Sequence, residues 1–222
     1  MHLKINKEGW VYLIFSILIS VILFPFFTIL SIFFIFLSIF IFYFFRDPIR
    51  AIPSNNVIVS PGDGKVVFVG ESEYPEELNL NEKALKISIF LSIFNVHVNR
   101  IPTSGIISEI IYVPGKFFNA NFDKSSKENE RNIVIIENIK KEKIVVSQIA
   151  GLIARRIVCN LNINQQVNTG DRYGIIKFGS RVDLFLPKYY KSMVVQDQLV
   201  IGGETIISNP DQIHEIKSSF KK

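Results

Sequence analysis

Cysteine and histidine are scarce in this chain of 222 residues. Cys159 is the only cysteine, which excludes an intramolecular disulfide and a cysteine-based metal cluster, and we predict no other metal site. Only one of the three histidines, His97, lies away from the chain ends, so it is the candidate for a histidine general base. The net charge of +5 is not gathered into a stripe of basic and aromatic residues, so we expect no nucleic-acid partner.

Charge is absent from the whole stretch between Gly9 and Phe45. One straight helix of that length would reach roughly 55 Å, whereas the hydrocarbon core of a bilayer is only about 30 Å thick. Pro25 lies near the middle and would kink or break such a helix. We therefore predict two apolar helices, roughly 10–24 and 27–45, as a membrane hairpin over residues 1–45. A re-entrant hairpin and one strongly bent span are the alternatives.

Basic residues flank this apolar stretch on both sides. Lys4 and Lys7 precede it, and Arg46 and Arg50 follow it. Cationic flanks favour the cytoplasmic side of a membrane. A hairpin with both ends in the cytoplasm satisfies both flanks, so we expect the protein at the cell membrane with its remaining residues on the cytoplasmic face.

Residues 46–222 have a different pattern, with no stretch of convincing helical periodicity. Short runs rich in β-branched residues alternate with Gly, Pro, Asn and Asp, which is typical of strands and turns. We predict a mainly β domain, a compact β sandwich or a partly closed barrel, and we expect 71–83 and 119–131 to be surface loops. The predicted strands are 57–59, 65–69, 85–91, 105–113, 132–137, 144–149, 152–158, 174–178, 182–186 and 205–207.

Three motifs within this region carry groups suited to chemistry. Gly179 and Ser180 stand between two apolar runs, and taken alone they are an ordinary turn. Asp63 belongs to a Pro-Gly-Asp-Gly segment, which is also a good turn sequence. His97 follows an apolar run, and taken alone it is a partly buried histidine bonded to the backbone.

Together these motifs resemble the phosphatidylserine decarboxylase family, in its short, membrane-bound class. The resemblance spans most of residues 40–210. Its more specific phrases surround His97 and Ser180, where this chain reads Phe-Asn-Val-His-Val-Asn-Arg and Phe-Gly-Ser-Arg. The weaker phrases are Phe44–Pro48, Val113–Lys116 and Gly202–Thr205. Larger bacterial members tend to have Leu-Gly-Ser-Thr and a second nearby histidine instead.

The resemblance implies a proenzyme that cuts itself between Gly179 and Ser180. The products are chains of 179 and 43 residues that stay together as a heterodimer. Ser180 becomes a covalent pyruvoyl group, which is the cofactor. Asp63 is implied to orient His97, and His97 to take the proton of the Ser180 hydroxyl, with the logic of a serine-protease triad.

The same resemblance implies a lyase of phospholipid biosynthesis. The pyruvoyl group forms a Schiff base with the amine of phosphatidylserine in the bilayer, and loss of carbon dioxide gives phosphatidylethanolamine. A homo-oligomer stays open. Four arginines, Arg100, Arg155, Arg156 and Arg181, are candidates for the substrate's phosphate or carboxylate, although each taken singly is a surface or structural residue.

Two other classes of protein compete with the enzyme. Glycine turns near 170, 179 and 203 also suit a membrane-anchored lipoyl- or biotinyl-like carrier or adaptor module. A carrier needs an exposed lysine in a tight hairpin, and no Met-Lys-Met or Asp-Lys-Ala phrase is present. A tethered structural β domain would leave Asp63, His97 and Ser180 far apart.

Overall fold

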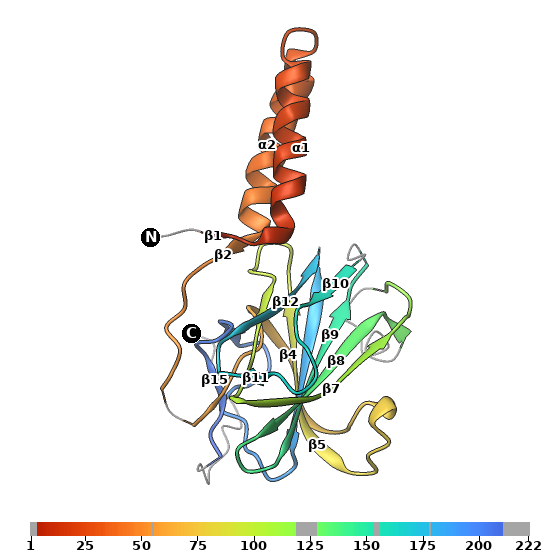
Figure 1. The fold of residues 1–222 in the computed structure, drawn as a ribbon, viewed down its shortest axis with the longest axis vertical. Helices are drawn as coiled ribbons and strands as arrows, with labels where there is room; N and C mark the ends of the chain where they lie inside the picture. The colour runs from red at the N-terminus through yellow and green to blue at the C-terminus, as the bar shows by residue number, and fades with distance from the viewer. Residues whose placement is uncertain (1–3, 55, 119–127, 153–155, 178, 211–222) are drawn as a thin grey trace.

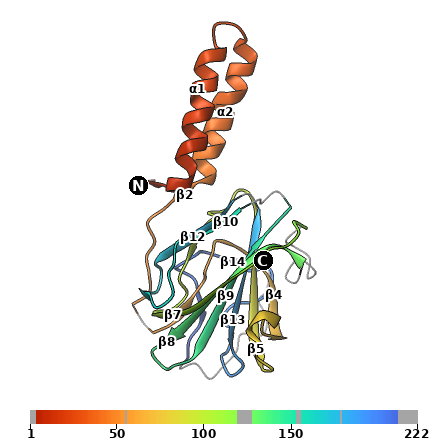
Figure 2. The same ribbon diagram turned by 45° about the vertical axis from the view of Figure 1, so that its right-hand side comes forward.

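The structure is a computed structural model that describes residues 4–54, 56–118, 128–152, 156–177 and 179–210. Two helices, α1 (Trp10–Leu23) and α2 (Thr28–Phe44), lie side by side and project from one end of the β structure (Figures 1 and 2). Pro25 lies in the turn between them, as its inability to continue a helix requires. Short elements bracket the pair at its foot, namely β1 (Lys4–Ile5), the 3-10 helix η1 (Lys7–Gly9) and β2 (Arg46–Asp47).

Within the described part of the chain, no single helix is both long enough and apolar enough to cross a bilayer.

Four serines line the contact between α1 and α2. Ser20 and Ser31 hydrogen-bond each other through their hydroxyls at 3.0 Å, and Ser38 donates to Ser16 at 2.9 Å. All four serines are buried, while Ile, Leu, Val and Phe side chains cover the outside of both helices. The polar groups therefore face inward and the apolar groups outward, which reverses the pattern of a helix pair in water.

One curled antiparallel sheet of eight strands forms most of the remaining structure, in the order β11-β7-β8-β9-β13-β5-β4-β14. Register shifts in β4 and β7 add local bends, which favour curling. Its strands are β4 (Gly64–Glu73), β5 (Lys83–Leu91), β7 (Gly105–Val113), β8 (Arg131–Asn138), β9 (Lys143–Ala150), β11 (Gln166–Val167), β13 (Ser180–Pro187) and β14 (Leu199–Val200). The prediction of a mainly β fold is confirmed, and the curled sheet has the shape of a half-barrel.

A smaller sheet, in the order β10-β12-β6, packs against the inner face of the large one. Its strands are β10 (Arg156–Cys159), β12 (Arg172–Lys177) and β6 (Val98–Arg100), and a separate pair is formed by β3 (Ile58–Val59) and β15 (Ile206–Ser208). The main core lies between the sheets and joins Ile89, Val146 and Leu184 of the large sheet to Tyr173 and Ile176 of β12. The inner face therefore encloses the region where β6, β12 and β13 meet.

The segment predicted as a surface loop over 71–83 is more ordered than expected. Its first residues belong to β4, and a 3-10 helix, η2 (Glu76–Leu78), follows. Tyr74 is buried and packs with Ala84 and Phe185 on the outer face of the large sheet. The prediction is wrong for residues 71–73, which continue β4, and for the buried Tyr74, because apolar residues spaced among the charged ones cover that face. Of the other predicted loop, residues 119–127 lie outside the described part.

Candidate active site

The Gly179–Ser180 pair lies between two strands of different sheets. Strand β12 ends at Lys177, β13 begins at Ser180, and residue 178 lies outside the described part. Gly179 has a φ of +70°, a left-handed conformation that glycine adopts without a steric penalty. Ser180 does not belong to a turn, although the Gly-Ser pair taken alone indicates one. It is the first residue of the central strand β13 and pairs with Leu91 of β5 and Ala150 of β9. The neighbouring strands β5 and β9 thus hold Ser180, the residue that follows the Gly179–Ser180 peptide bond.

The Ser180 hydroxyl is fully buried and finds no hydrogen-bond partner among the described residues. Most buried polar groups in native proteins are hydrogen-bonded, because an unsatisfied one costs about 1–3 kcal/mol. Ser180 also shares its inner face of the sheet with Val182 and Leu184 of the core. The Ser180 hydroxyl is therefore a buried polar group that no hydrogen bond among the described residues satisfies.

His97 lies just before β6 and is fully buried. Its ring stacks on Phe44 with the centroids 4.1 Å apart, and its Nδ1 lies 3.0 Å from the carbonyl oxygen of Asn95. Because a carbonyl only accepts, Nδ1 carries the proton and Nε2 keeps its lone pair. Nε2 is buried and has no partner among the described residues. Burial, with a smaller effect from Arg46, lowers the pKa of His97 to about 4, so the ring is neutral near pH 7.

Asp63 does not contact His97 through a hydrogen bond in this structure. Its Oδ2 accepts from Arg50 at 2.6 Å, and its Oδ1 accepts from the backbone N–H of Gly202 at 2.8 Å. Burial raises the pKa of Asp63, and the charge of Arg50 opposes that rise. The carbonyl of Asn95, not a carboxylate, fixes the tautomer of His97. The expected Asp63–His97–Ser180 chain of hydrogen bonds is therefore not assembled, and the catalytic roles of these residues stay predictions.

The strand pairing does bring His97 and Ser180 into one region. Val98, next to His97, pairs with Ile175 of β12, and β12 leads within three residues to Ser180. A Cβ added to Gly179 would lie 3.9 Å from the side chain of Ile93, which precedes His97 on the connection from β5 to β6. Both bare groups, Nε2 and the Ser180 hydroxyl, thus belong to the end of the β structure that carries the helices.

Side-chain amides form a chain that the sequence analysis missed. Asn132 donates to Gln148 at 3.0 Å, and Gln148 donates to Asn99 at 2.8 Å, which leaves the buried Asn99 Nδ2 without a partner among the described residues. Gln148 lies two residues from Ala150, the pairing neighbour of Ser180, and so on the same face of the sheet. Gln148 is a polar residue near the end of the largely apolar strand β9, and this was the sequence signal that could have indicated the chain of amides.

The arginines considered for substrate binding are mostly engaged elsewhere. Arg100 is buried, contacts Asp47 at 3.2 Å and donates to the carbonyl of Gly170 at 2.9 Å. Arg181 points to the outer face, where it donates to Asp183 at 2.6 Å. Arg156 is exposed in β10, and Arg155 lies outside the described part. Arg100 and Arg181 are structural in this arrangement.

Comparisons with known proteins identify the family of the chain. The family model for phosphatidylserine decarboxylase matches residues 37–208. A phosphatidylserine decarboxylase proenzyme of Wolbachia sp. subsp. Brugia malayi (strain TRS) is 47% identical over 209 residues, 93% of this chain and 91% of the relative. The proenzyme of Pelagibacter ubique (strain HTCC1062) is 48% identical over 207 residues, 92% of this chain and 96% of the relative. That of Rickettsia akari (strain Hartford) is 48% identical over 207 residues, 92% and 90%.

The matched range contains all the elements that build the site, from the end of α2 to β15. The bare hydroxyl after a left-handed glycine and the neutral buried imidazole lie inside it. On this sequence coverage and identity, the chain belongs to the phosphatidylserine decarboxylase family.

Proposed function

We propose that the chain is a membrane-bound proenzyme that cleaves itself between Gly179 and Ser180 and then decarboxylates phosphatidylserine to phosphatidylethanolamine. The observation that carries this proposal is the Ser180 hydroxyl, which is buried and bare and follows a glycine with positive φ. Relatives named phosphatidylserine decarboxylase proenzyme cover over nine-tenths of the chain and support the reaction class.

Self-cleavage begins with the attack of Ser180 Oγ on the carbonyl carbon of Gly179. The Oγ–C bond forms, the C–N bond to residue 180 breaks, and the hydroxyl proton ends on the released nitrogen. Elimination then removes the Cα proton of residue 180 to a base and breaks its Cβ–Oγ bond, which forms the Cα=Cβ double bond and leaves a carboxylate on Gly179. Addition of water to the remaining enamine, through its imine form, releases ammonia and leaves the ketone. No oxidant or reductant is needed.

His97 is the base for the first step in this proposal. Its Nε2 lone pair is bare, and its Nδ1 proton is held by Asn95, so the ring is ready to accept a proton on one side only. Stacking on Phe44 fixes the plane of the ring. Asp63 has a positioning role, because its carboxylate ties the Arg50 linker to the Gly202 turn.

The residues around position 180 fit a small covalent carbonyl. Leu91 and Ala150 flank it in the sheet, and the unpaired Asn99 Nδ2 lies on the same inner side as a donor for a developing negative charge. Once formed, a pyruvoyl group supplies a ketone that condenses with the substrate amine and accepts the electrons left by carbon dioxide. In this proposal His97 is also the group that returns a proton.

The helix pair is the membrane anchor in this proposal. Its serines are buried between the helices and its apolar side chains face outward, which suits lipid rather than water. Cations at the foot, Lys7, Arg46 and Arg50, favour the cytoplasmic face. The substrate's acyl chains then stay in the bilayer while its headgroup enters the site.

Intact-mass analysis of the detergent-solubilised protein tests the proposal. We expect chains of 179 and 43 residues, the smaller one lighter by one ammonia than a chain that begins with serine. Ser180→Ala should stay uncut and inactive on phosphatidylserine vesicles. An uncut wild-type chain contradicts the enzyme and favours the carrier module. Native mass analysis of the cut protein then tests the heterodimer and any homo-oligomer.

A further inference from the structure

Aromatic and basic side chains form a belt at the foot of the helix pair. Trp10, Tyr12 and Tyr43 are each exposed by two-fifths or more. The guanidinium of Arg46 lies 3.8 Å from the centre of the Tyr43 ring, and Lys177 Nζ lies 5.3 Å from that of Tyr12. Amphipathic aromatic residues and cations gather at the headgroup level of membranes. We call these five residues the belt, and its position marks the level of the lipid interface.

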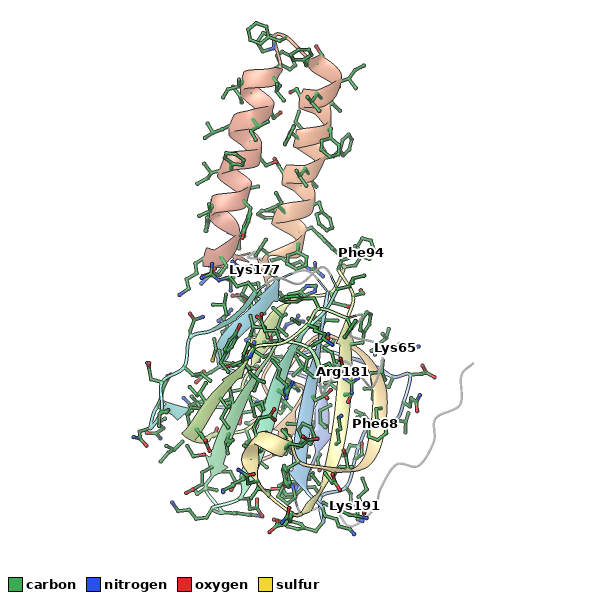
Figure 3. All side chains as sticks on the ribbon, turned by 90° about the vertical axis from the view of Figure 1, so that its right-hand side faces the viewer. Lys65, Phe68, Phe94, Lys177, Arg181 and Lys191 are labelled. Carbon is green, nitrogen blue, oxygen red and sulfur yellow. The ribbon has the colours of Figure 1, made fainter. Side chains whose placement is uncertain are left out.

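Phe94 lies at the level of the belt, although it belongs to the β structure. Its carbonyl accepts a hydrogen bond from Arg46 at 2.8 Å, and Arg46 also donates to the carbonyl of Tyr43 at 2.7 Å. Figure 3 shows Phe94 beside the foot of the helices, on the other side from Lys177. The Phe94 side chain is 62% exposed. One arginine therefore joins the helix pair to the turn that carries an exposed aromatic ring.

The turn from Ser92 to Asn95 holds Phe94 outward. Asn95 Oδ1 accepts from the backbone N–H of Ser92 at 2.8 Å and from its hydroxyl at 2.7 Å, and the backbone N–H of Asn95 donates to the Ser92 carbonyl. A phenylalanine ring exposed to water forgoes the favourable transfer of its apolar surface out of water. A turn tied in this way keeps that exposed ring in place instead of letting it fold back.

The same turn contacts the proposed reaction centre. A Cβ added to Gly179 would lie 3.9 Å from Cγ2 of Ile93. The carbonyl of Asn95 accepts the hydrogen bond of His97 Nδ1. The residues on each side of Phe94 therefore lie beside Gly179 and hold the proposed base. The position of Phe94 is thus coupled to the position of the proposed site.

We propose that Phe94 inserts into the lipid interface as a third contact beside the two helices, so that the Ser180 site opens at headgroup depth. The inference rests on the proposed membrane anchor. Three observations select lipid as the occupant: continuity with the apolar helix pair, the exposed aromatic residues of the belt at the same level, and the cation Arg46 for anionic headgroups. Phosphatidylserine thus reaches the site without leaving the bilayer.

Depth-dependent quenching of a single tryptophan tests the insertion. Trp10 is the only tryptophan, so a Trp10→Phe background takes one new tryptophan at a time. Phe94→Trp is the test, Phe33→Trp in α2 reports the helix pair, and Ile139→Trp is the matched exposed control. Ile139 is 85% exposed in the turn before β9, at the opposite end of that strand from Ala150 and Ser180.

The full-length protein is placed in vesicles of phosphatidylcholine and phosphatidylglycerol whose acyl chains are brominated near the carbonyl or near the methyl end. We expect Phe33→Trp and Phe94→Trp to be quenched, Phe94→Trp more by the shallow bromine, and Ile139→Trp to be unaffected. Quenching at 33 with none at 94 overturns the inference and leaves the anchor intact. No quenching at either position overturns the anchor as well. The tryptophan at position 94 could instead be shielded from water without being quenched by bromine, in a particle of twice the expected mass. That result assigns the ring to a contact with a second copy of the chain and overturns the inference.

Activity gives a second readout. Phe94→Ser should raise the apparent KM for vesicular phosphatidylserine about tenfold, since one interfacial phenylalanine is lost, while Phe94→Leu restores most of it. Ile139→Ser should leave KM unchanged. The cut fraction, measured by intact mass, shows whether the Ser180 site survives each change. An equal KM for Phe94→Ser and wild type at full cleavage contradicts the inference.

Discussion

The buried polar groups on the two faces of β13 differ in whether they are paired. On the outer face, Arg181 donates to Asp183 at 2.6 Å and to Ser88 at 2.8 Å, and Lys86 lies 3.1 Å from Asp183. On the inner face, the Ser180 hydroxyl has no partner among the described residues, and single polar atoms of the buried His97, Asn99 and Tyr173 also lack one there. Figure 3 shows Arg181, the second residue of β13, below the helix pair. The polar groups of the outer face are paired, whereas the Ser180 hydroxyl on the inner face is not.

This difference separates a structural cluster from a candidate active site. Buried charges are stable when each finds an opposite charge and hydrogen bonds. The ionised form of Asp183 is opposed by burial, yet Arg181 and Lys86 outweigh that effect and lower its pKa. Unpaired groups such as the Ser180 hydroxyl cost stability instead, and natural proteins retain such violations mainly at functional sites.

The strongest test of the comparison replaces the serine on each face, Ser180 or Ser88, with alanine. Ser180→Ala should abolish cleavage and all activity, yet leave the free energy of unfolding unchanged or slightly higher, because the lost hydroxyl had no partner. Ser88→Ala should cost about 1 kcal/mol and leave cleavage intact, because its hydroxyl accepts from Arg181. Intact mass and denaturant unfolding measure both. Efficient cleavage of Ser180→Ala would contradict the assignment.

His97→Gln should slow self-cleavage by about 10²–10⁴-fold, the usual contribution of general-base catalysis. The wild-type rate should be flat from about pH 6 to 8 and fall only toward pH 4, because burial lowers the pKa of His97 to about 4. The same shift makes the folded state lose stability as the pH falls from about 6.5 to 4, since the unfolded chain binds the proton first. Time courses of freshly translated proenzyme measure the rate. A rate midpoint near pH 6.5 would show a base other than this buried ring.

Asp183→Asn should destabilise the fold by about 3–5 kcal/mol, because Arg181 and Lys86 lose their shared buried carboxylate. The expected chemistry of the folded fraction is unchanged. Denaturant midpoints compare this variant with Lys86→Met/Arg181→Met/Asp183→Leu, which removes all three charges and should recover most of the loss. A stable Asp183→Asn protein with impaired cleavage would contradict the view that the outer face is structural and the inner face catalytic.

Asn99→Ala should slow cleavage and decarboxylation by about 10²-fold if its unpaired amide stabilises developing negative charge. Asn132→Ala is the matched control at the other end of the amide chain, and it should have a smaller effect on rate. Single-turnover cleavage and steady-state lipid assays separate the two steps. Equal rates for wild type and Asn99→Ala would reduce this amide to a packing role.

The strands were largely predictable because β-branched runs and turn residues are local signals. β7 spans the predicted residues 105–113, and β5, β8 and β9 differ from their predicted ranges by no more than two residues at either end. The very short strands β6 and β11 were missed, because two or three residues carry no periodicity and are held by their partners. The predicted strand 152–158 began too early, since β10 starts at Arg156 and residue 152 is a bend.

The sequence by itself determined the two apolar helices broken at Pro25, the mainly β character of the rest, and the identity of Ser180 and His97 as candidates. The helices and strands depend on local hydrophobic patterns and turn residues. His97 is a candidate because histidine is rare in the chain, and Ser180 because of the Phe-Gly-Ser-Arg motif. Only the tertiary structure decided that Asp63 bonds Arg50 and Gly202 instead of His97, and that Asn99, Gln148 and Asn132 join into one chain. Hydrogen-bond partners are chosen among groups far apart in the chain by distance and burial, which no local pattern encodes.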